Sequence, residues 1–86
     1  MDELEALREK IDAVDDQILR DIVVRLKICR AIGELKKQQG ISVHDIQREA
    51  EVFKRVRERA ELYKIDPVKI ERLYHEIVNI CTSVQE

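Results

Sequence analysis

The 86-residue chain is poor in the residues that interrupt helices and in aromatic side chains. It contains two glycines, one proline and no tryptophan, and aromatic residues make up only 3% of it. This scarcity disfavours a fold built from many tight turns and favours an all-helical, water-soluble chain. No stretch approaches the roughly 18 apolar residues that a transmembrane helix needs. The first residues, Met-Asp-Glu-Leu-Glu, are acidic and lack the apolar core of a signal peptide.

Charge and cysteine content exclude several classes of partner. The net charge is −2, and the cations are interleaved with acids, so neither nucleic acid nor an anionic membrane is indicated as a partner. Cys29 and Cys81 are far apart and lie at helical core positions, which predicts reduced cysteines in a cytoplasmic protein. No cysteine–histidine spacing typical of a metal site occurs, and we expect neither a metal nor a cofactor.

The spacing of apolar residues predicts three helices in one domain, residues 1–86. The first is expected over residues 4 to about 37, with Gly40 as a left-handed cap. The second is expected over about 45–64, and the third from Asp66-Pro67 to the last residue, with aspartate caps at both starts. Gly33 lies inside the first helix, where it indicates either close helix packing or space for a ligand.

The first helix is too long for the rest of the chain to cover. A helix over residues 4–37 spans about 51 Å, whereas a compact domain of this size has a radius of gyration of about 12 Å. We therefore expect its apolar row to pack on a second copy, in an intertwined antiparallel homodimer of one long and two shorter helices per chain. The row contains Leu4, Leu7, Ile11, Val14, Ile18 and Ile22.

Cations interrupt this apolar row. Arg25 and Lys36 occupy row positions, and Arg8 borders the row. A buried cation needs an anionic partner, which is either a carboxylate of the protein or a ligand. Arg25 and Lys36 share one face and lie about 16 Å apart along the axis, whereas Arg8 lies about 26 Å from Arg25. In an antiparallel dimer, Arg8 therefore serves the site of the partner.

The start of the second helix adds three charged residues. Asp45 reads first as the helix cap, and Arg48 either faces solvent or adds to a cationic wall. Glu49 falls on the apolar side of the helix, where it either pairs with Lys36 or Arg25 or accepts a ligand hydroxyl. Gln85, near the end of the third helix, either points inward or faces solvent. Together these charges would suit a dicarboxylate that carries a hydroxyl.

The sequence offers no covalent catalyst. His44 and His75 lie beside no plausible nucleophile, and no glycine-rich phosphate loop is present. A reaction that depends on positioning and electrostatics remains.

Taken together, these features resemble the all-helical, type II class of chorismate mutases. The matching segments are LREKID at 7–12, VD at 14–15, IL at 18–19, Arg25, IGELK at 32–36 and DIQRE at 45–49. The resemblance covers essentially the whole chain and implies an intertwined homodimer that rearranges chorismate to prephenate, on the route to phenylalanine and tyrosine.

The resemblance also implies a role for each site residue. Arg25 and the partner subunit's Arg8 would hold substrate carboxylates. Lys36 and Gln85 would contact the ether oxygen whose bond breaks. Glu49 would accept the ring hydroxyl, assisted by the backbone near Asp45, and Arg48 would complete the cationic wall.

One position departs from the family pattern, and two other functions stay open. Cys81 stands where the family often has a substrate-contacting serine, and a thiol is a weaker donor.

An isochorismate–pyruvate lyase on the same fold is the nearest alternative function. A non-catalytic helical dimerisation module is the other, and there Arg25, Lys36 and Glu49 would form an internal ion network.

Overall fold

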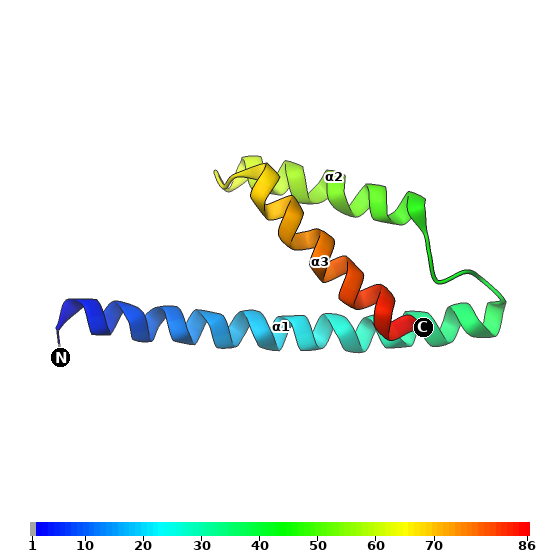
Figure 1. Ribbon diagram of the computed structural model, residues 1–86, viewed down its shortest axis with the longest axis horizontal. Helices are drawn as coiled ribbons and strands as arrows, with labels where there is room; N and C mark the ends of the chain where they lie inside the picture. The colour runs from blue at the N-terminus through cyan, green and yellow to red at the C-terminus, as the bar shows by residue number, and fades with distance from the viewer. Residues whose placement is uncertain (1) are drawn as a thin grey trace.

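Three helices make up most of the described chain. The computed structural model describes residues 2–86 and contains α1 (Glu3–Gln39), α2 (Ile46–Leu62) and α3 (Pro67–Gln85) (Figure 1). No strand occurs within these residues. The all-helical class and the order of one long and two shorter helices are therefore confirmed. None of the helices described is long and apolar enough to cross a membrane.

The helix ends follow the capping residues of the sequence. Gly40 closes α1 in the left-handed conformation, with φ of 66°. The carboxylate of Asp45 accepts a hydrogen bond from the backbone N–H of Arg48 at 3.0 Å and opens α2. Asp66 caps α3 in the same way, directly before Pro67. Because Lys64 takes a positive φ of 60°, α2 ends at Leu62 rather than at about residue 64.

α3 joins the other two helices. It crosses α1 near its own C-terminus and packs against α2, while no Cα atoms of α1 and α2 lie within 8 Å of each other (Figure 1). His75 stacks on Phe53 with ring centroids 4.0 Å apart, and Arg57 donates to Glu71 at 2.6 Å. Both contacts hold α2 against α3. The space between α1 and α2 is thus set by the angle at which α3 leaves α1.

A single chain covers little of its own apolar surface. The apolar residues it buries are Cys29, Ala60 and Val78, and the molecule measures 57 × 25 × 15 Å. Its radius of gyration is 16.3 Å, well above the value of about 12 Å for a compact domain of this length. The N-terminal part of α1 projects beyond α2 and α3 (Figure 1). Its apolar row is 50–60% exposed at Leu4, Leu7, Ile11, Val14 and Ile18.

The expectation of reduced cysteines was wrong. Cys29 and Cys81 form a disulfide, with Cα atoms 5.5 Å apart and 52 residues between them in sequence. Both cysteines do lie at helical core positions, as the apolar spacing indicated. Because α3 crosses α1 at this level, the two core positions face each other, and no feature of the sequence specifies that crossing.

Candidate functional site

A cavity of about 340 Å³ lies where the C-terminal half of α1, the start of α2 and the end of α3 meet. Every predicted site residue except Arg8 lines it. Those residues are Arg25, Lys36, Asp45, Arg48, Glu49, Cys81 and Gln85. Residues far apart in the sequence therefore converge within one chain, without help from a partner.

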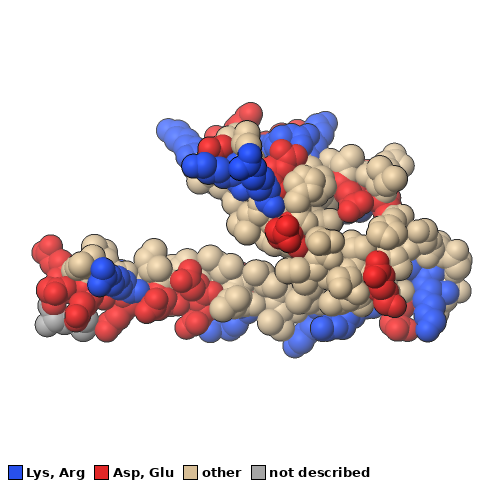
Figure 2. All heavy atoms as spheres, viewed as in Figure 1, with Lys and Arg blue, Asp and Glu red and all other residues tan. Residues whose placement is uncertain are grey.

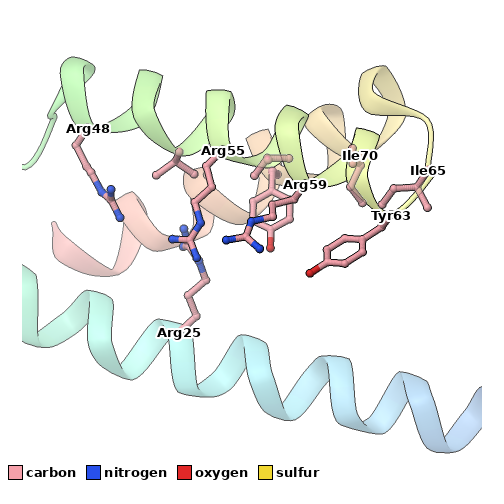
Figure 3. Close-up of a pocket in the computed structure, with 11 residues that line it drawn as sticks. Arg25, Arg48, Arg55, Arg59, Tyr63, Ile65 and Ile70 are labelled. Atoms are coloured by element: carbon pink, nitrogen blue, oxygen red, sulfur yellow. The ribbon is translucent and has the colours of Figure 1, made fainter.

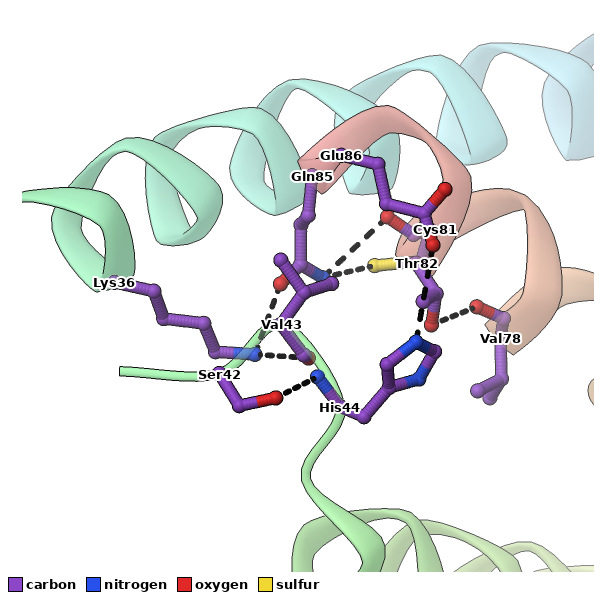
Figure 4. A network of polar contacts seen from close by, with 9 residues as sticks. All are labelled: Lys36, Ser42, Val43, His44, Val78, Cys81, Thr82, Gln85 and Glu86. Carbon is purple, nitrogen blue, oxygen red and sulfur yellow. Dashed lines mark hydrogen bonds and ion pairs between the residues drawn. The ribbon is translucent and has the colours of Figure 1, made fainter. Parts of the chain in front are cut away.

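Lys36 is fixed by two hydrogen bonds at one side of the cavity. Its Nζ donates to the backbone oxygen of Val43 at 2.8 Å and to Oε1 of Gln85 at 2.9 Å (Figure 4). An ammonium group has three donors, so one is left for a ligand. The first bond ties the loop after α1 to the helix, and the second ties α3 to α1.

The side-chain amide of Gln85 is held at both ends. Its Oε1 accepts from Lys36, and its Nε2 donates to the backbone oxygen of Cys81 at 3.4 Å and approaches Sγ of Cys81 at 3.6 Å (Figure 4). Gln85 therefore points inward, the first of the two orientations that the sequence left open. The contacts of Nε2 are long, so this donor is easily transferred to a stronger acceptor.

Gly33 allows α3 to approach α1 this closely. A Cβ at position 33 would lie 2.9 Å from the Cα of Gln85, closer than two carbon atoms can pack. Of the two interpretations of Gly33, close helix packing is therefore the one that the structure supports. The glycine brings Gln85 within reach of Lys36.

The cations of the cavity lack carboxylate partners inside it. Within residues 2–86 the ion pairs are His44–Glu86, Arg48–Glu51 and Arg57–Glu71. None of them joins Arg25 or Lys36 to Glu49, so the internal ion network expected of a non-catalytic module is not formed. Arg25 contacts Sγ of Cys29 at 3.8 Å, and Glu49 is half-buried. Half-buried cations in this arrangement are suited to an anionic ligand.

A second cavity of about 580 Å³ adjoins the first and is rich in arginine. It opens between α1 and α2, and Arg25 and Arg48 line both cavities. Arg55 and Arg59 also point into it, and Tyr63 lies at its far end (Figure 3). We did not predict these two arginines. Their spacing of seven and eleven residues from Arg48 places all three on one face of α2, which is the signal that could have identified them.

Arg8 does not reach either cavity of its own chain. It is exposed on the projecting part of α1, 17 residues before Arg25 on one continuous helix. This places it about 26 Å away along the axis. Nor does any group of three His, Cys, Asp or Glu side chains, in the part of the chain described, stand where it could hold a metal ion.

Comparisons with known proteins agree with this architecture. The family model described as chorismate mutase type II matches residues 7–86. The chain is 35% identical, over its full length, to a bifunctional chorismate mutase/prephenate dehydratase of Aquifex aeolicus, and it covers 25% of that protein. It is also 35% identical to a 4-amino-4-deoxychorismate mutase of Streptomyces pristinaespiralis, covering 99% of this chain and 66% of the relative.

A solved structure shares the fold. A conserved hypothetical protein from Pyrococcus furiosus superposes with a TM-score of 0.79 at 30% identity, covering 100% of this chain and 99% of the other. The chain thus spans only a quarter of the Aquifex relative and about two thirds of the Streptomyces one, but nearly all of this solved chain.

We expect Gly33→Ala to push the end of α3 away from α1. The new Cβ collides with the backbone of Gln85, and overpacking of this kind costs about 1–3 kcal/mol. The unfolding temperature should fall, and a crystal structure should show Lys36 Nζ more than 3.5 Å from Gln85 Oε1. Gly40→Ala is the control, because position 40 faces open space and its left-handed backbone alone costs about 1 kcal/mol. An unchanged Lys36–Gln85 bond in Gly33→Ala would refute this role of Gly33.

Proposed function

We propose that this chain, which belongs to the chorismate mutase type II family, rearranges chorismate to prephenate. The observation that carries the proposal is the convergence of Arg25, Lys36 and Arg48 with Glu49 and Gln85 in one cavity, without ion pairs among them. The cavity offers positive charge and hydrogen-bond donors to a dianion. Within residues 2–86, its lining contains no serine, cysteine thiol or histidine, and the hydroxyl of Thr82 donates to the backbone oxygen of Val78.

The reaction suits a site of this kind because it is pericyclic. One C–O bond breaks while one C–C bond forms within the same molecule, so no nucleophile and no proton transfer are needed. The enolpyruvyl arm must be folded over the ring, and two fixed carboxylate clamps accomplish this. Arg25 and the partner subunit's Arg8 are the proposed clamps, since a guanidinium binds a carboxylate through two parallel hydrogen bonds.

Lys36 and Gln85 supply the electrostatic part of the catalysis. Negative charge builds on the ether oxygen as its bond to the ring stretches, and donors placed there stabilise the transition state. The third donor of Lys36 is available, and Nε2 of Gln85 can leave its long contacts with Cys81 for this oxygen. The hydrogen bond between Lys36 and Gln85 keeps the two donors adjacent before substrate binds.

The remaining residues orient the ring. Glu49 is half-buried without an ion-pair partner in the described chain, and we assign its carboxylate to the ring hydroxyl. Arg48 adds positive charge, while Asp45 fixes the start of α2 through its cap. The expected contact of a Cys81 thiol with substrate is not kept, because Cys81 is in a disulfide and has no S–H to donate.

An antiparallel homodimer would complete this site. The exposed row on α1 needs a cover, and Asp and Glu outnumber Lys and Arg by seven to two over residues 2–16. Figure 2 shows these acidic side chains along the projecting part of α1, with cations over α2. The arginine-rich second cavity suits the acidic segment of a partner, which would bring the partner subunit's Arg8 to the first cavity.

Two further predictions concern the whole chain. They are a single mutase domain over residues 1–86 and a cytoplasmic location.

Two related substrates are the alternatives. The Streptomyces relative is named for 4-amino-4-deoxychorismate, which carries an amine in place of the ring hydroxyl. Isochorismate, the substrate of a lyase on the same fold, carries its hydroxyl elsewhere on the ring.

Purified protein should convert chorismate to prephenate with a higher kcat/KM than it shows for either alternative. If the protein consumes none of the three, the proposed function is wrong.

Lys36→Ala should lower kcat by about 100-fold or more, since it removes a donor at the oxygen that gains charge. Lys37→Ala is the matched control: it is the neighbouring lysine, exposed on α1, and should keep the wild-type rate. Circular dichroism and gel filtration check that both variants remain folded in the same oligomeric state. Near-normal turnover by Lys36→Ala would remove this residue from the mechanism.

A mixing experiment tests whether two subunits share each site. Arg8→Ala and Lys36→Ala should each be nearly inactive alone. After the two are unfolded together and refolded, half of the dimers are mixed, and each mixed dimer contains one intact site, so activity should recover to about a quarter of wild type. Refolding each variant separately is the control. No recovery would contradict a site to which the partner contributes Arg8.

A further inference from the structure

We infer that the Cys29–Cys81 disulfide is a positioning element of the site, which holds Gln85 in register with Lys36 and makes the reaction rate depend on the redox state of the protein. The inference rests on the proposed mutase function. The disulfide joins the helix that carries the cations to the helix that carries the amide donor.

The disulfide lies one helical turn from a proposed substrate contact on each side. Cys29 follows Arg25 by four residues, and its Sγ lies 3.8 Å from a guanidinium nitrogen of Arg25. Cys81 precedes Gln85 by four residues, and its Sγ lies 3.6 Å from Nε2 of Gln85. Both cysteines line the cavity, and Cys29 is only 3% exposed. The covalent link is thus built into the wall of the site.

The last turn of α3 has few other restraints. No basic residue lies in the last turn of α3, and Glu86, which follows it, pairs at 3.8 Å with the exposed side chain of His44 in the loop after α1. The hydroxyl of Thr82 bonds to Val78 on the same helix, so it does not tie α3 to α1. Apart from the disulfide, the bond from Lys36 to Gln85 is the polar link between these two helices in the part of the chain that the structure describes.

Breaking the disulfide would loosen this crossing. A dithiol reductant supplies two electrons and two protons, so the cystine becomes two thiols and the reductant becomes a cyclic disulfide. The two thiols are no longer joined covalently, so the end of α3 can shift relative to α1. A displacement of about 1 Å at a catalytic donor lowers a rate by up to about 100-fold.

The test compares the same protein, oxidised and then reduced with dithiothreitol under denaturant-free conditions, with thiol counting to establish each state. We expect reduction to lower kcat by about 10- to 100-fold and to change KM much less, because the donor acts mainly where charge develops. Cys29→Ser should have the low kcat of the reduced protein and should not respond to the reductant. Assays are run well below the unfolding temperature of each form.

Gln85→Ala separates positioning from general stabilisation. If the disulfide acts through Gln85, its reduction has little left to affect once Gln85 is removed. Reduction of Gln85→Ala should therefore lower kcat by no more than about twofold, because two changes that act through one group are not additive. An equal kcat in oxidised and reduced wild type would overturn the inference. An equal loss in wild type and Gln85→Ala would also overturn it, because the disulfide would then act on the fold as a whole.

A spectroscopic measurement keeps the inference testable without turnover. The side-chain amide signals of Gln85, assigned by their loss in Gln85→Ala, should be dispersed in ¹⁵N–¹H spectra of the oxidised protein. They should move to the position of a free glutamine on reduction. If the oxidised protein rearranges no substrate, the proposed function fails while this measurement still decides the positioning. Unchanged signals on reduction would refute it.

Discussion

The close crossing of α3 over α1 is the constraint on which the site depends. Gly33 permits the backbones to approach, the disulfide joins them one turn away, and the bond from Lys36 to Gln85 completes the crossing. Because α2 packs on α3 and not on α1, the same crossing also sets where Arg48 and Glu49 lie. A glycine and a cystine, neither of them a typical substrate contact, therefore determine the geometry of every charged wall of the cavity.

The charges of the cavity explain why this geometry has a function. Arg25 and Lys36 are half-buried, and within residues 2–86 they form no ion pair with Asp45 or Glu49, which line the same cavity. Other acids gather on the projecting part of α1. Such an arrangement gives up some stability so that binding of an anion is favourable. The same separation of charge would favour association of two chains in opposite directions, since the acidic end of one meets the arginines of the other.

Local signals in the sequence predicted the three helices and their caps. They did not predict contacts between residues that are far apart in the sequence. Asp45, Asp66 and Gly40 act through hydrogen bonds to residues no more than four positions away, so the sequence specifies them. Arg25, Lys36 and Glu49 were identified because charge on an apolar helix face is unusual. The disulfide was missed because its partners meet only through the crossing of two helices, and Arg55 and Arg59 were missed because cations on a helix otherwise appear solvated.

α2 and α3 pack together, and α3 joins this pair of helices to α1. The stacking of His75 on Phe53 and the Arg57–Glu71 ion pair hold the two helices against each other. A small change of tilt where α3 meets α1 is therefore magnified along α2, which lies farther from the pivot. Substitutions at the crossing can widen or narrow the side of the cavity formed by α2 while the cations of α1 stay in place. Substrate preference in such a molecule can change by mutations that never touch the substrate.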